Sequence, residues 1–107
     1  MKIVSIHQPN YLPWLPFFSK ILASDIFIFY DTAQYKKNEY MNRNKIKTPQ
    51  GAMYLTIPLK SEKSSMKKII DVELPENDLW REKHLKAIRS NYSRTLYFND
   101  FFPLLED

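Results

Sequence analysis

Hydrophobic positions in the first thirty residues follow strand and helix spacings in turn. Residues 2–6 form a short apolar run typical of a strand inside a sheet, and residues 26–30 form a second such run. Between them, residues 14–24 carry apolar side chains at the spacing of one helix face. A strand, a helix and a strand with short connections predict a right-handed βαβ unit with parallel strands.

The apolar face of the predicted helix bears on how the unit packs. Its members are Trp14, Phe17, Phe18, Ile21 and Leu22. We interpret these side chains as core, because an apolar helix stripe normally packs against a neighbouring element. Pro13 and Pro16 are compatible with the helix, since they fall in its first turn, where amides lack partners within the helix.

The middle of the chain predicts further strands. A turn signal at residues 48–51 separates residues 41–47 from residues 52–59, and both flanking segments partly alternate between apolar and polar positions. This pattern predicts a hairpin or two adjacent antiparallel strands. Residues 60–68 are charged and Ser-rich, which indicates a mobile surface loop, and residues 69–74 predict one more strand.

Helical spacing returns near the end of the chain. Residues 78–92 predict an amphipathic helix with Asn77 or Asp78 as its cap. His84 lies beside the apolar face, and we interpret it as a core histidine, with a role in a site as the alternative. Residues 99–105 predict a short apolar helix or turn, whose surface would serve a homodimer if left uncovered.

These elements predict an α/β fold. We expect one small domain over residues 1–107 that starts with the βαβ unit and continues into a mixed sheet, with the C-terminal helix packed on that sheet. The length suits a single hydrophobic core. No apolar run approaches the ~20 residues that cross a bilayer. The polar residues His7–Asn10 also interrupt the N-terminal apolar run, so we predict no signal peptide and a cytoplasmic protein.

Polar side chains follow both strands of the predicted unit. His7, Gln8, Asn10 and Tyr11 lie after the first strand, and Asp31 follows the second. Carboxyl ends of parallel strands meet at one edge, so His7 and Asp31 are expected at the same edge. We predict that His7 is a general base or phosphate contact and that Asp31 orients it. A capped loop with ordinary hydrogen bonds, and a turn role for Asp31, are the alternatives.

A long polar loop, residues 32–51, comes next, and loops of this length are often functional. Its candidate substrate-binding residues are Gln34, Tyr35, Asn42 and Arg43. Arg43 is the candidate for a bidentate contact with a carboxylate or phosphate, and a surface salt bridge is its alternative. We expect this loop to lie over the polar residues His7–Asn10. It would then close a polar pocket that has positively charged side chains on one wall.

Composition narrows the chemistry further. Gly51 is the single glycine, which excludes Walker and dinucleotide-binding loops, and the absence of Cys excludes thiolate nucleophiles and thiolate zinc sites. We predict no metal site and leave the cofactor unknown. The net charge of +4 favours an anionic partner, such as a phosphate-bearing substrate, a nucleotide or RNA; a solvated basic surface is the alternative.

Two long motifs carry a family resemblance. SIHQPNYLPW and FIFYDTAQYKKNEYMNRNKIKTPQG resemble the bacterial WbqC-like family, whose members are often encoded among genes for O-antigen and other surface polysaccharides. The resemblance extends from Met1 to about Phe102. Pro16 stands where the family usually has Gly, and Thr32 follows Asp31 where a second Asp is common. The chain is shorter than is typical, so it resembles a short member or the N-terminal part of one.

The resemblance implies a function that the residues alone do not define. It implies a transferase of sugar or sugar-carrier substrates in surface polysaccharide biosynthesis, with a small anionic substrate such as a nucleotide-sugar. A nucleotide- or RNA-binding module is the second hypothesis, and a non-catalytic interaction protein is the third. RNA binding would weaken steeply with salt, whereas binding of a small substrate in a pocket would not.

Overall fold

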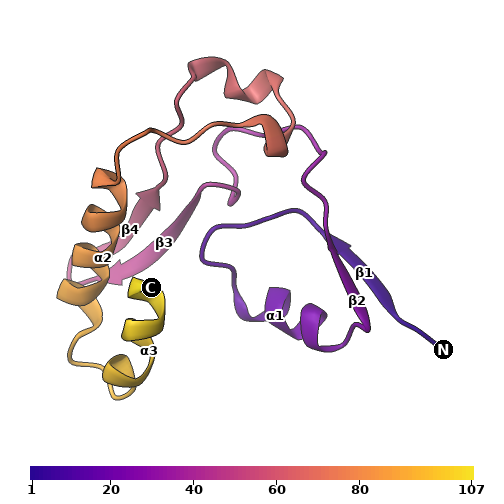
Figure 1. Cartoon of the computed structure of the whole chain (residues 1–107). Coiled ribbons are helices and arrows are strands. Elements are labelled where there is room, and N and C mark those ends of the chain that lie inside the picture. Colours follow the sequence, from indigo (N-terminus) through magenta and orange to yellow (C-terminus); the bar gives the residue numbers. More distant parts are fainter. The chain divides into compact units, whose positions relative to one another are not determined.

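A computed structural model describes the backbone of all 107 residues and every side chain except that of Glu62 (Figure 1). The chain divides into two compact units. Unit 1 consists of Met1–Asn44 and Thr56–Pro75, and unit 2 consists of Lys45–Leu55 and Glu76–Asp107. Parallel and antiparallel strand pairs occur together with helices, which confirms the α/β class. The strands form two separate two-stranded sheets, and the prediction of a single domain stays a prediction.

Unit 1 begins with the predicted βαβ unit. Strand β1 (Val4–His7), helix α1 (Leu15–Leu22) and strand β2 (Ile26–Phe29) follow in that order. The strands are parallel, with Val4 opposite Ile26 and His7 opposite Phe29. The parallel topology is therefore confirmed, and the carboxyl ends of β1 and β2 share one edge as expected.

Helix α1 lies against this pair of strands (Figure 1). Its buried residue is Phe17. Phe17 is 5% exposed, and its ring centroid lies 5.0 Å from that of His7 and 5.6 Å from that of Phe27. Phe18 is 48% exposed, and Trp14 is 68% exposed. The prediction that the whole stripe is core is wrong, because a two-stranded sheet covers only a narrow part of a helix face.

The opposite face of the strand pair is open. The side chains of Val4, Ile6, Ile26 and Ile28 are exposed. These residues alternate with those that face α1, as the two-residue period of a strand requires. The expectation of a strand inside a sheet is therefore wrong for β1, which has a single neighbouring strand.

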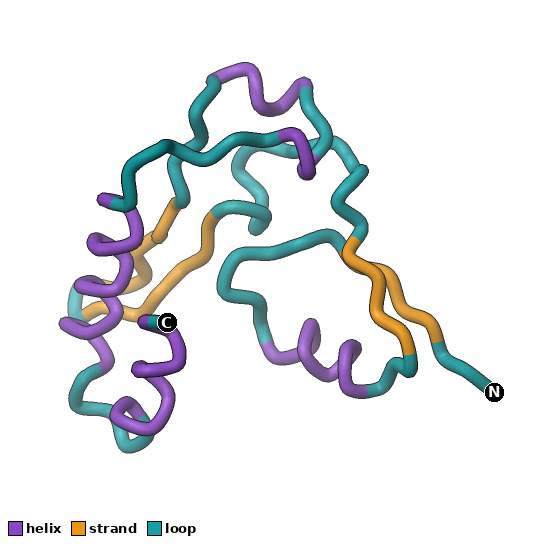
Figure 2. Tube along the Cα trace, viewed as in Figure 1, coloured by secondary structure: helices purple, strands orange, loops and turns teal.

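The rest of unit 1 contains short helical turns (Figure 2). The 3-10 helices η1 (Glu62–Met66) and η2 (Ile69–Asp71) replace the predicted loop at residues 60–68 and strand at residues 69–74. The Ile69 amide donates to Ala33 O (2.8 Å) and the Ile70 amide to Asp31 O (2.8 Å). The strand prediction fails because these amides bond to the segment after β2 instead of a strand partner.

Unit 2 contains the predicted hairpin. Strand β3 (Arg43–Thr48) pairs with β4 (Gly51–Thr56), and the first two residues of β3 belong to unit 1. Gly51 has φ +110°, a value that side chains disfavour, and its carbonyl accepts a bond from Thr48 Oγ1 (2.7 Å). The turn signal therefore predicted this hairpin correctly.

Two helices complete unit 2. In α2 (Leu79–Tyr92), the Tyr92 hydroxyl accepts a bond from the Lys47 amide (2.7 Å), which ties the helix to the hairpin. His84 is buried, in agreement with a core role. Helix α3 (Phe98–Glu106) is held to α2 by the ion pair between Arg89 and Glu106 (3.0 Å). None of the described helices is long and apolar enough to span a bilayer.

Phe17 makes the main aromatic contacts of α1, so truncating it should destabilise unit 1. Phe17→Ala is expected to lower the free energy of unfolding by about 3–5 kcal/mol, since it leaves a cavity among three other rings. The half-exposed Phe18 is the matched control, and Phe18→Ala should cost clearly less. Urea unfolding monitored by circular dichroism measures both. Equal losses for the two variants would contradict this packing.

Candidate functional site

Three hydrogen bonds join the loop after β1 to residues 40–44, which lead into β3, within unit 1. The Asn44 side-chain amide donates to the carbonyl oxygens of Tyr11 (3.2 Å) and Leu12 (2.8 Å). The Tyr11 backbone amide donates to Tyr40 O (3.0 Å). We call these three bonds the Asn44 junction. It fixes residues 10–14 against residues 40–44.

The Asn44 junction holds an unfavourable backbone conformation. Leu12 has φ +45°, in the left-handed region that bulky side chains rarely adopt, and it precedes Pro13, which favours extended backbone. The bond from Asn44 to Leu12 O stabilises this conformation. Trp14 then adopts extended backbone as the N-cap of α1, and its side chain is exposed. Local strain of this kind concentrates at functional sites.

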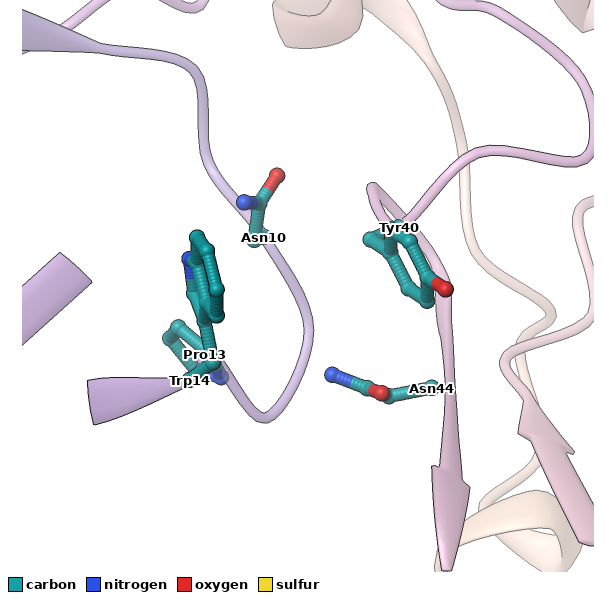
Figure 3. Close-up of a pocket in the computed structure, with 5 residues that line it drawn as sticks. All are labelled: Asn10, Pro13, Trp14, Tyr40 and Asn44. Atoms are coloured by element: carbon teal, nitrogen blue, oxygen red, sulfur yellow. The ribbon is translucent and has the colours of Figure 1, made fainter. Parts of the chain in front are cut away.

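This arrangement forms a pocket without charged walls, which we call the uncharged pocket (Figure 3). Its volume is about 410 Å³, and it is lined by Asn10, Pro13, Trp14, Tyr40 and Asn44. Asn10 and Trp14 lie on one side and Tyr40 and Asn44 on the other (Figure 3). The two aromatic rings are half-exposed or more, so they are accessible to a ligand.

A second cavity of about 660 Å³ lies in the same unit. We call it the cationic pocket, because Lys37 and Arg43 line it and no carboxylate occurs among its described lining residues. Its hydroxyl groups come from Tyr35, Thr56, Ser61, Ser64 and Ser65. Residues 35–44 contribute to both pockets, so one segment borders the uncharged and the cationic site.

Hydrogen bonds order the wall of the cationic pocket. The Tyr35 hydroxyl donates to Asn42 Oδ1 (2.9 Å), and Asn42 Nδ2 donates to Ile57 O (2.9 Å). Arg43 Nη2 donates to Asn38 O (2.8 Å), and Asn38 has φ +65°. Burial raises the pKa of Tyr35 above its usual value of 10.0, and the nearby Arg43 charge lowers it to a smaller extent. Tyr35 is therefore a neutral phenol near pH 7.

The predicted catalytic pair lies at the expected edge of the strands. The Tyr30 amide donates to His7 O (2.8 Å), and Asp31 follows directly. His7 Nδ1 lies 2.7 Å from Gln8 O, and its ring contacts Phe17. No hydrogen bond or ion pair joins the described side chains of His7 and Asp31. Their catalytic roles therefore stay predictions.

The predicted substrate-binding residues divide between several places. Asn10 lines the uncharged pocket, while Tyr35, Asn42 and Arg43 line the cationic pocket. Tyr11 takes part in the Asn44 junction through its backbone, and burial raises the pKa of its phenol. Gln34 Nε2 donates to Ser65 O (2.6 Å), and the Gln8 carbonyl faces His7. The binding roles of these residues stay predictions.

Several lining residues were not among the candidates drawn from the sequence. They are Trp14, Tyr40 and Asn44 in the uncharged pocket, and Ser61, Ser64 and Ser65 in the cationic pocket. Trp14 fits the helix spacing and was therefore assigned to the core. The three serines lie in the charged, Ser-rich segment that we predicted to be a mobile surface loop.

Comparisons with known proteins relate the chain to one family. The model of the WbqC-like protein family matches residues 8–107. An uncharacterized protein of Mycobacterium tuberculosis is 40% identical over 98 residues, which are 92% of this chain and 42% of that protein. The chain thus spans less than half the length of this relative. No solved structure matches the chain significantly.

Removing the Asn44 amide should destabilise unit 1. Asn44→Ala leaves the carbonyls of Tyr11 and Leu12 without this donor, so the free energy of unfolding should fall by about 1–3 kcal/mol. Asn10→Ala is the matched control, because the Asn10 amide has no hydrogen bond to another described residue. Urea titration measures both variants. Equal stability of Asn44→Ala and wild type would show that the junction contributes nothing.

Burial of Tyr35 predicts a pH dependence at alkaline pH. Its pKa is higher in the folded than in the unfolded chain, so the folded state retains the proton longer. The free energy of unfolding should therefore fall as the pH rises from about 10 through the folded pKa. Tyr35→Phe should make this fall shallower, and Tyr97→Phe, at an exposed position, is the control. Identical slopes for wild type and Tyr35→Phe would contradict the assignment.

Proposed function

We propose that this chain binds a phosphate-bearing sugar substrate, such as a nucleotide-sugar. The bound sugar would serve a transferase reaction in bacterial surface polysaccharide synthesis. The chain belongs to the WbqC-like protein family. The cationic pocket is the observation that carries the proposal. Its volume falls within the range of about 300–1,000 Å³ that small-molecule sites usually have. The family resemblance supplies the biosynthetic context.

The walls of the cationic pocket suit a phosphate group. The planar guanidinium of Arg43 can donate two parallel hydrogen bonds to phosphate oxygens, and Lys37 adds a second positive charge. The hydroxyls of Ser61 and Ser65 supply further donors to oxygen. The net charge of +4 favours approach of an anion. Side chains take the recognition role that glycine-rich backbone loops have in other phosphate sites.

The proposed chemistry uses these groups to stabilise a leaving group. An acceptor hydroxyl attacks the anomeric carbon of the sugar, and the bond from that carbon to the diphosphate oxygen breaks. The diphosphate leaves with the electron pair, and the two cations stabilise its charge. We propose that His7 takes the proton of the acceptor hydroxyl and that Asp31 orients His7.

A nucleotide- or RNA-binding module is the second candidate, and one observation favours it. The exposed rings of Trp14 and Tyr40 lie in the unit that carries the cationic pocket, and bases stack on such rings. RNA binding would lose affinity steeply between low and moderate salt, because counterions are released along the backbone. A small substrate in a pocket would show a shallow salt dependence.

Arg43 allows a direct test of the cationic pocket. Arg43→Ala should reduce the affinity for a nucleotide-sugar by at least about tenfold, since a charge-assisted contact to phosphate is lost. Arg43→Lys should be nearly as harmful, because a point charge does not reproduce the planar fork. Titration calorimetry with a panel of nucleotide-sugars at two salt concentrations measures both variants.

Lys63 supplies the control for this test. It lies on η1, beside the serines of the pocket, but it is not among the residues that line it. Lys63→Ala should bind like wild type while removing the same charge as Arg43→Ala. Suppose that Arg43→Ala binds each nucleotide-sugar as tightly as the wild type does. This result would refute the cationic pocket as a phosphate site and favour the non-catalytic interaction protein.

A further inference from the structure

Three side chains of the uncharged pocket present polar groups that the described protein residues do not engage. They are the Asn10 amide, the Trp14 indole N–H and the Tyr40 hydroxyl. Polar groups at a ligand site usually find their partners on the ligand. The pocket therefore offers donors and acceptors of hydrogen bonds without any charge.

Apart from Asn10 and Asn44, the pocket lining consists of two aromatic side chains and a proline. Trp14 and Tyr40 come from opposite sides, and Pro13 lies beside Trp14 (Figure 3). Aromatic side chains combine apolar area with a polar handle and lose little conformational freedom on binding. Such walls suit a ligand that is apolar on its faces and polar around its rim.

We infer that the uncharged pocket binds the neutral sugar ring of the substrate. A pyranose has C–H groups on its faces and hydroxyl groups spread around its rim, and each hydroxyl both donates and accepts. Asn10 matches this pattern because its amide also donates and accepts. A phosphate would find no cation among the described residues that line this pocket. A nucleobase also has apolar faces and a polar rim, so the test below includes a nucleoside to distinguish it from a sugar ring.

The Asn44 junction prepares this pocket before a ligand arrives. Asn44 holds the strained Leu12 turn, and that turn sets the positions of Asn10 and Trp14. Asn44 is thus a positioning residue. A loop fixed in its bound conformation loses less entropy on binding, which raises affinity.

The link between sugar ring and phosphate rests on the proposed function. Residues 35–44 border both pockets, so a ligand with a neutral ring attached to a phosphate matches the two sites in character. The sugar-ring site itself does not depend on this link, because a free glycoside carries the same ring. This difference allows the two claims to be tested separately.

Fluorine NMR of the chain labelled with 5-fluorotryptophan tests the sugar-ring site. The chain has two tryptophans, so Trp80 in unit 2 supplies an internal control, and Trp14→Phe assigns the signals. Methyl glycosides of glucose, galactose, mannose, N-acetylglucosamine, rhamnose and fucose are titrated to saturation or solubility. At least one should shift the Trp14 signal and leave that of Trp80 unchanged. Uridine is titrated in the same way, as the nucleoside that carries a base. The inference would be overturned if none of the six glycosides shifted the Trp14 signal, or if uridine alone shifted it.

Variants then connect the ring to the phosphate. Trp14→Leu and Asn10→Ala should each weaken binding of a nucleotide-sugar by roughly fivefold to tenfold in calorimetry and leave the affinity for the matching nucleoside diphosphate unchanged. Leu15→Ala, at an exposed neighbour outside the pocket, is the control.

The two claims fail in different ways. Suppose that Trp14→Leu binds a nucleotide-sugar with wild-type affinity, while Arg43→Ala weakens binding of the same compound. This result would overturn the sugar-ring site and leave the proposed function standing. A glycoside shift at Trp14, with no gain in affinity from an attached diphosphate, would support the sugar-ring site and refute the proposed function.

Discussion

The site in unit 1 depends on the two hydrogen bonds that the Asn44 amide donates. Their acceptors, Tyr11 and Leu12, lie 33 and 32 residues earlier in the sequence, so the bonds join the loop after β1 to the beginning of β3. Leu12 would otherwise relax toward the extended backbone that Pro13 favours. Two residues later, Trp14 has extended backbone as the N-cap of α1, and its side chain is exposed.

The Asn44 junction helps to explain why residues 35–44 border both the uncharged pocket and the cationic pocket. Residues 35–44 reach Tyr11 at the junction, where the Tyr11 amide donates to Tyr40 O (3.0 Å). The Tyr35 amide donates to Lys67 O (2.9 Å), which keeps the same segment beside η1 and its serines. The bridge between Gln34 and Lys68 fixes the other end of that segment. A segment held at both ends gives its side chains defined positions, which is what selective binding of a small ligand requires.

Much of the fold followed from residue spacing, whereas the site followed only in part. Helices α1 and α2 were predicted because continuous apolar periodicity reports local structure. Trp14 was assigned to the core because periodicity cannot tell that an N-cap residue has left the helical conformation. The 3-10 helix η2 was taken for a strand because strand-type residues do not reveal their hydrogen-bond partners. The hydrogen bonds of Asn44 were not predicted for the same reason, since their acceptors are distant in sequence.

Hydrogen exchange at the Tyr11 backbone amide reports on whether the site is formed before a ligand binds, because this amide donates to Tyr40 O in the junction. If the junction is preformed, the amide is protected in the free protein. Its exchange should slow further when a nucleotide-sugar or a methyl glycoside that shifts the Trp14 signal is bound, since residues on both sides of this bond line the proposed sugar-ring site. Exchange at the rate of an unstructured amide, or a rate unchanged by a bound ligand, would contradict a preformed site at this junction.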